Sequence, residues 1–173
     1  MTQDDDATWI EDCVREHGLS LVSYADRLLN DADRARDVVQ NAFIKLCRQS
    51  RQKVEPKAKE WLFTVCRNEV MDILRKEHRM TPLDDRQTEQ CPCSAPLPSE
   101  KLESTETNSR LIRVLNVLPP NQRDVIRLKF LHNMSYKEIS RVTRLSVSNV
   151  GFLIHTGLKT MRGQMNQQEG SSL

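Results

Sequence analysis

The chain has 173 residues, and 26 lysine and arginine side chains against 24 aspartate and glutamate side chains give a formal net charge of +2. This length allows one domain of ordinary size or two small ones, and it excludes a large barrel enzyme. Hydrophobic residues make up 38% and aromatic residues 5% of the chain, with 5 glycines and 7 prolines, so the composition favours packed helices over a turn-rich β fold.

Charge is unevenly distributed along the chain. Residues 41–80 carry a net charge of +5 and residues 110–173 a net charge of +7, whereas residues 1–40 and 81–109 carry −6 and −4. Two basic blocks, each beside an acidic one, are typical of two modules that each meet a polyanion. Fluctuation along a solvated surface would give a similar pattern, so charge alone leaves both interpretations open.

Residues 1–80 are expected to form a first small helical domain. Residues 9–16 predict a short helix that Gly18 ends, and the apolar pattern of residues 19–29 predicts a second helix. Asn30 and Asp31 supply cap chemistry for a third helix. The expected buried face of that third helix is Ala35, Val38, Val39, Ala42, Phe43 and Leu46.

A polar loop is expected at residues 49–59, followed by a long helix over residues 58–79. The predicted buried stripe of this helix is Trp61, Leu62, Val65, Cys66, Ile73 and Leu74. Its other side carries Arg67, Asn68, Arg75, Lys76 and Arg79, and basic residues at helical spacing can follow a phosphate backbone. Trp61 is expected either to anchor the core or to stack on an exposed base.

Residues 81–108 predict a flexible, acidic, proline-rich linker. The stretch has no helical periodicity and holds four of the seven prolines, and its polar composition cannot bury enough apolar surface to offset the entropy of ordering. Cys91 and Cys93 lie within it, and no second cysteine pair follows. We expect unligated thiols and no metal site, with a redox or metal role as the open alternative. Residues 166–173 predict a disordered polar tail.

Residues 109–165 predict a second helical domain that contains a helix-turn-helix. An apolar helix is expected to stop at Pro119 and Pro120, with Asn121 helping to cap the next helix. The segment SYKEISRVTRLSVSNV, residues 135–150, then combines two helix starts with a short polar turn. Two short helices joined this way can place the second in a major groove, although an ordinary helical corner has the same spacing.

The helix starts within this segment are specific. Ser135 followed by Glu138 is a capping-box pattern, and Ser146 is a second N-cap candidate. Ile139 and Val142 are expected to face inward. The following helix has the apolar residues Val147, Val150, Ile154, Leu158 and Met161.

Three segments together resemble bacterial sigma factors of the extracytoplasmic-function (ECF) branch. DADRARDVVQNAFIKL at residues 31–46 resembles the family's region 2.2, and WLFTVCRNEVMDILRK at residues 61–76 resembles regions 2.3 and 2.4. LPPNQRDVIRL at residues 118–128, with the helix-turn-helix after it, resembles region 4. The resemblance covers about residues 19–79 and 111–163, and it implies an all-α fold of two small helical domains joined by a flexible linker.

The resemblance implies a role for each surface. Region 2.2 of the family docks on core RNA polymerase, which makes Asp37, Gln40, Asn41 and Phe43 interface candidates, with a core position as the alternative for Phe43. The family reads and melts the −10 element with the loop before Trp61 and the helix after it. The implied −10 contacts are Trp61, Arg67, Asn68, Arg75, Lys76 and Arg79. Region 4 would bind the −35 element and the polymerase flap.

The second helix of the helix-turn-helix departs from the family. Relatives usually carry Lys and Arg there, whereas residues 151–157 carry none, and Gly151 and Gly157 weaken helix propensity. Reading of the −35 element would then depend on Ser148, Asn149 and His155, and Phe152 would contact a thymine methyl or pack. Expected phosphate or flanking contacts are Arg123, Arg127, Lys137, Arg141, Arg144 and Lys159.

The sequence contains none of the catalytic motifs that we considered. It lacks a phosphate-binding glycine loop, an HExxH motif and a nucleophile elbow, so we expect neither catalysis nor a cofactor. The implied function is promoter recognition and the start of strand separation for core RNA polymerase, with an anti-sigma factor as a possible further partner. The alternatives are a helix-turn-helix regulator with a helical regulatory domain and a recombinase-like enzyme.

The sequence also predicts where the protein acts. No apolar run is long enough to cross a membrane, and the acidic N-terminus has no signal-peptide pattern. We therefore expect a cytoplasmic protein whose cysteines are mostly reduced. Cys13, Cys47 and Cys66 lie on or beside apolar stripes and are expected in the core.

Overall fold

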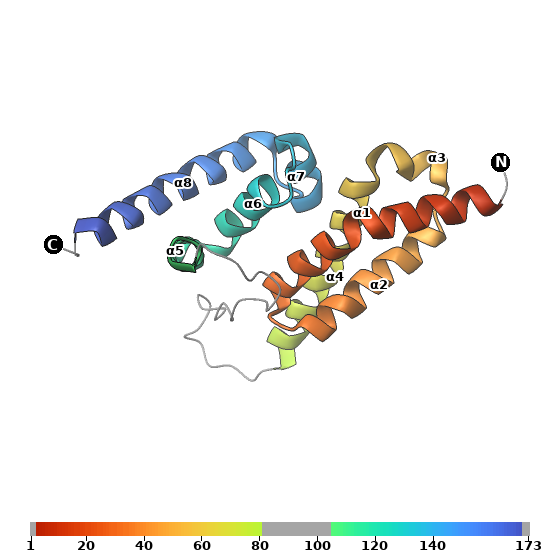
Figure 1. Ribbon diagram of the computed structural model, residues 1–173, viewed down its shortest axis with the longest axis horizontal. Coiled ribbons are helices and arrows are strands. Elements are labelled where there is room, and N and C mark those ends of the chain that lie inside the picture. Colours follow the sequence, from red (N-terminus) through yellow and green to blue (C-terminus); the bar gives the residue numbers. More distant parts are fainter. Residues whose placement is uncertain (1–2, 81–104, 171–173) are drawn as a thin grey trace. The chain divides into compact units, whose positions relative to one another are not determined.

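The computed structural model describes residues 3–80 and 105–170, and every element within these ranges is a helix (Figure 1). The chain divides into two compact units, Met1–Thr88 and Glu89–Leu173. The predicted all-α fold with two helical parts is confirmed. Residues 81–104 of the expected linker lie outside the described residues, whereas residues 105–108 already belong to a helix.

The first unit consists of α1 (Gln3–Leu29), α2 (Ala32–Cys47), α3 (Arg51–Val54), the 3₁₀ turn η1 (Glu55–Lys57) and α4 (Ala58–Met80). The helices α1, α2 and α4 pack against one another, and Figure 1 shows α1 and α2 running side by side. The rings of Tyr24 and Phe63 are fully buried, with 5.3 Å between their centroids. This tilted aromatic pair joins α1 to α4 at the centre of the core.

The prediction that Gly18 ends a first short helix is wrong, because α1 continues through it as one helix. A glycine cap needs a left-handed backbone, and no glycine among the described residues has a positive φ. Cys13 and Leu21, on either side of Gly18, are both buried. Packing on both sides offsets the roughly 1 kcal/mol that glycine costs inside a helix, and Asn30, with φ of 56°, ends α1 instead.

The expected loop at residues 49–59 is also largely wrong, since α3 and η1 turn through it before α4 begins. Val54 and Ala58 are buried, which holds this turn against the rest of the unit. Arg51 and Glu55, four residues apart, form an ion pair of 2.8 Å. Two apolar residues are too few to show helical periodicity, so the sequence pattern gave no signal here.

The face that α4 buries differs from the predicted stripe. Leu62 and Cys66 are buried as expected, and Phe63 and Val70 are buried with them. Trp61 is only half-buried, like Val65, Ile73 and Leu74. α4 packs against both α1 and α2, and the two neighbours together decide which of its apolar residues are fully buried.

The second unit consists of α5 (Thr105–Val117), α6 (Pro120–Phe130), α7 (Tyr136–Thr143) and α8 (Val147–Gly170). The three helices α6, α7 and α8 pack against one another, and α5 packs on α8. The predicted inward positions Ile139 and Val142 are fully buried. The other large side chains of this core include Leu118, Leu128, Met134, Val150 and Ile154.

Two helix ends in this unit differ from expectation. α6 begins at Pro120, and Pro119 with an extended backbone is its N-cap, so Asn121 is not the cap. Proline fits there because the first helical N–H has no partner within the helix. α8 runs on to Gly170, so residues 166–170 are helical where a tail was expected, and residues 171–173 lie outside the described residues.

Gly157 has a packing role that its low helix propensity did not suggest. It is buried, and a Cβ added to it would lie 2.5 Å from Cδ1 of Ile126 on α6. The absent side chain therefore lets α6 and α8 approach closely.

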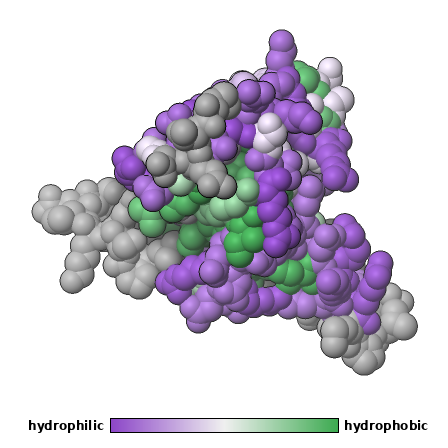
Figure 2. Space-filling model, turned by 90° about the vertical axis from the view of Figure 1, so that its right-hand side faces the viewer, coloured by the Kyte–Doolittle hydropathy of each residue, from purple (hydrophilic) through white to green (hydrophobic). Residues whose placement is uncertain are grey.

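Figure 2 shows that hydrophilic residues cover most of the visible surface, with hydrophobic residues grouped between them.

Candidate nucleic-acid and polymerase interfaces

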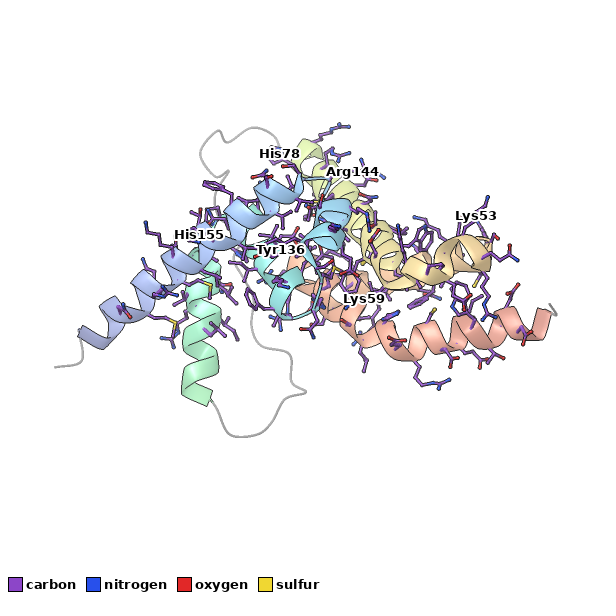
Figure 3. The ribbon with its side chains drawn as sticks, turned by 90° about the horizontal axis from the view of Figure 1, so that it is seen from above. Lys53, Lys59, His78, Tyr136, Arg144 and His155 are labelled. Atoms are coloured by element: carbon purple, nitrogen blue, oxygen red, sulfur yellow. The ribbon has the colours of Figure 1, made fainter. Side chains whose placement is uncertain are left out.

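The solvent side of α8 carries the residues predicted to read a −35 element. Ser148, Phe152, His155 and Lys159 are all exposed, and their spacings of four, three and four place them on one stripe of the helix. Phe152 is 65% exposed, so the alternative that it packs in the core is excluded. Figure 3 labels His155 on this helix. The opposite side of α8 is buried through Val150, Ile154 and Met161.

The turn before α8 is fixed by local hydrogen bonds. The hydroxyl of Ser140 donates to the carbonyl of Leu145 at 2.6 Å, and Oγ of Ser146 accepts from the backbone N–H of Asn149 at 3.1 Å. Arg144 has φ of 61° and ends α7 in a left-handed conformation. The predicted N-cap at Ser146 is therefore confirmed, and the first turn of α8 starts from a defined position.

The start of α7 is held by the predicted capping box. Oγ of Ser135 accepts from the backbone N–H of Glu138 at 3.3 Å, and the backbone N–H of Ser135 donates to Oε2 of Glu138 at 2.7 Å. Two of the backbone donors at this helix end are thus satisfied. With α7 capped at its start and turned by Arg144 at its end, the two helices form the expected helix-turn-helix.

Exposed cations lie on α7, which packs against α8, and at its C-cap. Lys137, Arg141 and Arg144 are all exposed, and Figure 3 labels Arg144 at the end of the helix. On α8, Lys159 and Arg162 are exposed further toward the C-terminus. These side chains can reach phosphates on either side of a groove that admits α8.

Two arginines expected at the DNA backbone lie elsewhere. Arg127 is only 5% exposed, which argues against a phosphate contact. Nη2 of Arg123 donates to the carbonyls of Asn116 at 2.8 Å and Leu118 at 2.9 Å. Arg123 thereby satisfies carbonyls at the end of α5 that lack helical partners, so it holds the turn between α5 and α6.

Tyr136 is a residue of this surface that the sequence analysis missed. Its side chain is 39% exposed at the first position of α7, and a Cβ added at Gly151 of α8 would lie 3.6 Å from its ring. Nζ of Lys129 lies 5.5 Å from the centre of the same ring, within the range of a cation–π contact. The contact joins residues fifteen positions apart on two helices, so helical periodicity gave no signal for it.

The face of α2 expected to meet polymerase is mostly exposed. Asp37, Gln40 and Asn41 are exposed, and Phe43 is half-buried, so Phe43 lies between its two expected positions. Nδ2 of Asn41 donates to Oε1 of Glu69 at 2.7 Å. Glu69, on α4, also pairs through Oε2 with Nζ of Lys45 at 2.8 Å. One carboxylate, missed by the sequence analysis, therefore fixes two side chains of α2.

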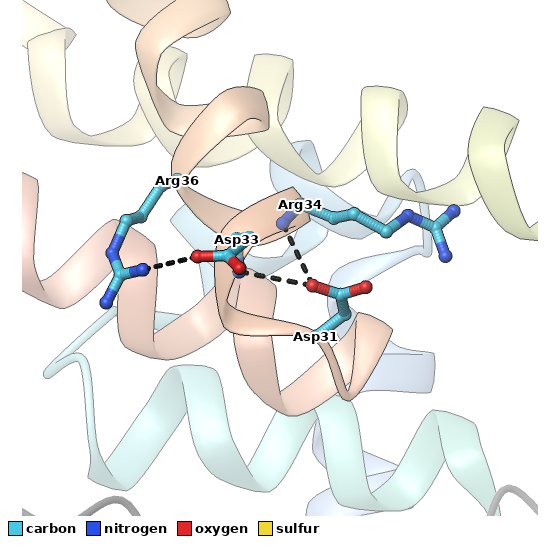
Figure 4. A network of polar contacts seen from close by, with 4 residues as sticks. All are labelled: Asp31, Asp33, Arg34 and Arg36. Atoms are coloured by element: carbon cyan, nitrogen blue, oxygen red, sulfur yellow. Dashed lines mark hydrogen bonds and ion pairs between the residues drawn. The ribbon is translucent and has the colours of Figure 1, made fainter.

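The N-terminus of α2 is held by charges that surround its first turn. Oδ1 of Asp31 accepts from the backbone N–H groups of Asp33 and Arg34, each at 3.1 Å, and Arg36 pairs with Asp33 at 2.7 Å (Figure 4). The predicted cap at Asp31 is confirmed. Arg34 also pairs with Glu77 of α4, so the exposed face of α2 is oriented by contacts at both of its ends.

The predicted −10 residues fall into two groups along α4. Trp61, Arg67 and Asn68 are half-buried in its first half. Arg75, Lys76 and Arg79 are exposed in its last half, and Nη1 of Arg75 lies 3.0 Å from Oδ1 of Asp72. The second group presents positive charge to solvent, whereas the first group lies partly within the helix packing.

The segment before α4 carries further basic residues. Lys53 and Lys57 are exposed, and Figure 3 labels Lys53 and Lys59. Arg51 donates to the backbone carbonyl of Asp5 at 3.0 Å and lies 5.7 Å from the centre of the Trp9 ring. A separate hydrogen bond, from Nη2 of Arg51 to Oε1 of Glu55 at 2.8 Å, lowers the pKa of the Glu55 carboxyl. Arg51 thus ties α3 to the start of α1.

The cysteines of the first unit differ in exposure. Burial is the main cause that raises the pKa of the Cys13 thiol, and burial raises the pKa of Cys66 to about 12. Cys47 is exposed, so its predicted core position is wrong; it stands at the last residue of α2, beyond the buried stripe. Cys91 and Cys93 lie outside the described residues.

Neither a metal site nor a membrane span occurs in the described parts of the chain. Within residues 3–80 and 105–170, no group of three or more His, Cys, Asp or Glu side chains could hold a metal ion. No helix in those ranges is long and apolar enough to cross a membrane.

Comparison with known proteins relates both units to one family. Residues 13–80 match the family model described as Sigma-70 region 2, and residues 108–161 match Sigma-70, region 4. The chain is 23% identical over 158 residues to the RNA polymerase sigma factor SigV of Bacillus subtilis (strain 168), which covers 91% of each protein.

A second relative and a solved structure agree. The chain is 28% identical over 155 residues to the ECF RNA polymerase sigma factor SigE of Mycolicibacterium smegmatis, covering 88% of this chain and 60% of SigE. Its fold is similar to that in the structure of the sigma factor RpoE in complex with the anti-sigma factor NepR from Bartonella quintana. The TM-score is 0.64 at 21% identity, covering 90% of this chain and 98% of the matched chain.

Proposed function

Because the chain belongs to the ECF-type RNA polymerase sigma factors, which are not enzymes, and carries sigma-70 regions 2 and 4, we propose that its two units divide promoter recognition. A sigma factor binds core RNA polymerase and promoter DNA. The first unit docks on polymerase and starts melting at the −10 element, and the second unit recognises the −35 element. The expected boundaries are residues 1–80 and 109–165, with residues 81–108 as the connection.

The polymerase contact of the first unit is the exposed face of α2, with Asp37, Gln40 and Asn41. Support comes from their exposure and from the anchoring of α2 to α4 through Glu69 and Glu77. An interface helix that is already oriented loses less entropy on binding. Phe43 is half-buried and contributes at the edge of this face.

The −10 contact is the basic C-terminal half of α4 together with the turn formed by α3 and η1. Arg75, Lys76 and Arg79 are exposed and would hold the phosphate backbone. Trp61, half-buried at the start of α4, keeps part of its ring accessible to an unstacked base. Arg67 and Asn68 lie between these two ends.

The single observation that carries the −35 assignment is the exposed stripe of α8 within a fully capped helix-turn-helix. Ser148, Asn149, Phe152 and His155 are exposed on it, and the adjoining helix α7 carries the exposed cations Lys137 and Arg141. A second helix held in this way is the element that enters a major groove.

Initiation on a normal promoter and on one with an unpaired −10 region tests these assignments. Trp61→Ala should lower open-complex formation on the paired promoter, and the unpaired bubble should restore it, because melting is the step affected. Gln40→Ala should lower binding to core polymerase, and the bubble should not restore it. Arg15→Ala, at an exposed position of α1, is the control. Rescue of both variants, or of neither, would contradict the division of roles.

The chain acts in the cytoplasm, and an anti-sigma factor binds it there. The related RpoE structure holds the anti-sigma factor NepR. This chain exposes Leu19 to 88% in the first unit and Phe130 to 54% in the second, and Leu19, the more exposed of the two, is the contact that we propose for such a partner. A candidate anti-sigma protein should lower transcription by the reconstituted holoenzyme, and a Leu19→Ser variant should resist it. Equal inhibition of both would contradict a contact at Leu19.

A further inference from the structure

The N-terminal half of α8 has an unusual combination of side chains for a helix that reads DNA. Residues 147–158 contain no Lys, Arg, Asp or Glu. Guanine is most often read by a bidentate arginine or lysine, and the exocyclic amine of cytosine by a carboxylate. This part of α8 therefore has neither of the charged groups that read G·C pairs.

The side chains that are exposed there match the other base pair. Asn149 is exposed, and its amide makes no hydrogen bond within the described residues, since only its backbone N–H is engaged, by Ser146. An asparagine amide can pair in bidentate fashion with N6 and N7 of adenine. Phe152 is 65% and Val147 44% exposed, and apolar groups of this kind contact the methyl group of thymine.

The geometry brings these groups to neighbouring base pairs. Asn149 is the third residue after the N-cap Ser146, in the turn that touches base edges in helix-turn-helix proteins. Phe152 follows three residues later, so the two side chains are neighbours on the helix surface. Exposed cations lie outside this patch, at Lys137 on α7, at Arg144 on its C-cap and at Lys159 further along α8, where they can meet phosphates.

We propose that α8 reads A·T base pairs in the −35 element, with Asn149 on adenine and Phe152 on a thymine methyl group. This inference rests on the proposed function of the second unit. It names the chemistry of the base pairs that this unit selects. Positive charge supplies affinity from the flanks, and the uncharged patch supplies the choice of base.

The experiment uses the reconstituted holoenzyme and a promoter whose −35 base pairs are randomised, with sequencing of the transcribed templates. We expect A·T pairs at two nearby positions. Asn149→Ala should reduce the preference for adenine at one of them by roughly five- to 150-fold, the range of a bidentate contact. Phe152→Ala should reduce the preference for thymine at the other by about fourfold, as expected for one buried methyl group. Asn166→Ala, exposed near the end of α8, is the matched control.

Modified bases test the same contacts with the unaltered protein. Uracil in place of the selected thymine removes only the methyl group, and 7-deazaadenine removes only N7. Each replacement should lower transcription with the wild-type chain, and it should have no further effect on Phe152→Ala or Asn149→Ala respectively.

Three results would overturn the inference. Selection of G·C pairs at the positions that depend on Asn149 and Phe152 would refute A·T reading and leave −35 recognition by this unit in place. Wild-type transcription that is insensitive to both modified bases would do the same. Transcription that is indifferent to every −35 base pair would overturn the proposed function of the second unit, and this inference with it.

Discussion

Replacing Gly157 by alanine tests how closely α6 and α8 pack in the second unit. The new Cβ would lie 2.5 Å from Cδ1 of Ile126 and 3.5 Å from two atoms of Gln122. Ile126 is 4% exposed, so its end methyl group has little room to rotate away. Extra volume in a packed core costs about 1–3 kcal/mol.

Helix propensity opposes this cost. Alanine is favoured over glycine inside a helix by about 1 kcal/mol, so the net effect of Gly157→Ala ranges from neutral to about 2 kcal/mol destabilising. Gly163 lies in the same helix with nothing within 4 Å of its added Cβ. Gly163→Ala should therefore show the favourable term alone, and the difference of about 1–3 kcal/mol between the two variants isolates the clash.

Hydrogen exchange of the full chain, followed by mass spectrometry of peptides from α6 and α8, gives this difference directly. Since 1.4 kcal/mol is a factor of ten, those peptides should exchange about five- to 150-fold faster in Gly157→Ala than in Gly163→Ala. Adding Ile126→Val removes the clashing methyl group and should close most of the gap. Equal exchange in the two alanine variants would refute close packing at Gly157.

Three further predictions concern the cap of α7, the basic end of α4 and the buried cysteine of α4. Ser135→Ala removes the acceptor of the capping box and should destabilise α7 by about 1 kcal/mol, seen as faster amide exchange in that helix. Arg75→Ala with Lys76→Ala should weaken promoter complexes and flatten the logarithmic dependence of binding on salt by about two, since each lost phosphate contact changes the slope by about 0.9. At about pH 8, alkylation should modify Cys47 and spare Cys66, because burial raises the pKa of Cys66 to about 12 and leaves almost no thiolate.

Each of these predictions has a control and an outcome that contradicts it. Ser148→Ala is the control, because it removes an exposed hydroxyl that caps nothing. If the amides of α7 exchanged equally fast in Ser148→Ala and Ser135→Ala, the capping box would not stabilise α7. Arg15→Ala is the control for the double variant, because it removes a cation from α1. If it flattened the dependence of promoter binding on salt as much as the Arg75→Ala and Lys76→Ala variant does, total charge and not the position of the charge on α4 would set that dependence. Cys66 that reacts as fast as Cys47 would mean that the first unit opens readily.

The features that the sequence predicted best are those decided within one or two helix turns. The caps at Asp31, Ser135 and Ser146 each involve hydrogen bonds to residues at most three positions away. The exposed stripe of α8 followed in part from helical periodicity: Val150, Ile154 and Met161 are buried, whereas Val147 and Leu158 of the same apolar pattern are exposed.

The predictions that were wrong concern residues whose contacts lie on other helices, distant in the sequence. The role of Gly157 comes from Ile126, on another helix, and the choice of buried residues on α4 comes from packing against two helices. Arg123 was expected on DNA from its charge, but the carbonyls at the end of α5 bind it. Charge predicts that a residue can meet a phosphate, and only the fold shows whether another group already occupies it.

Sequencing the RNA made by core polymerase with and without this chain, on fragmented genomic DNA, tests most directly whether it selects promoters. Transcripts that appear only with the chain should begin at defined sites, and their templates should share two short elements at a fixed distance, as two DNA-binding units held by one polymerase require. Identical start sites with and without the chain, or added transcripts without shared upstream elements, would contradict its assignment as the promoter-selecting subunit.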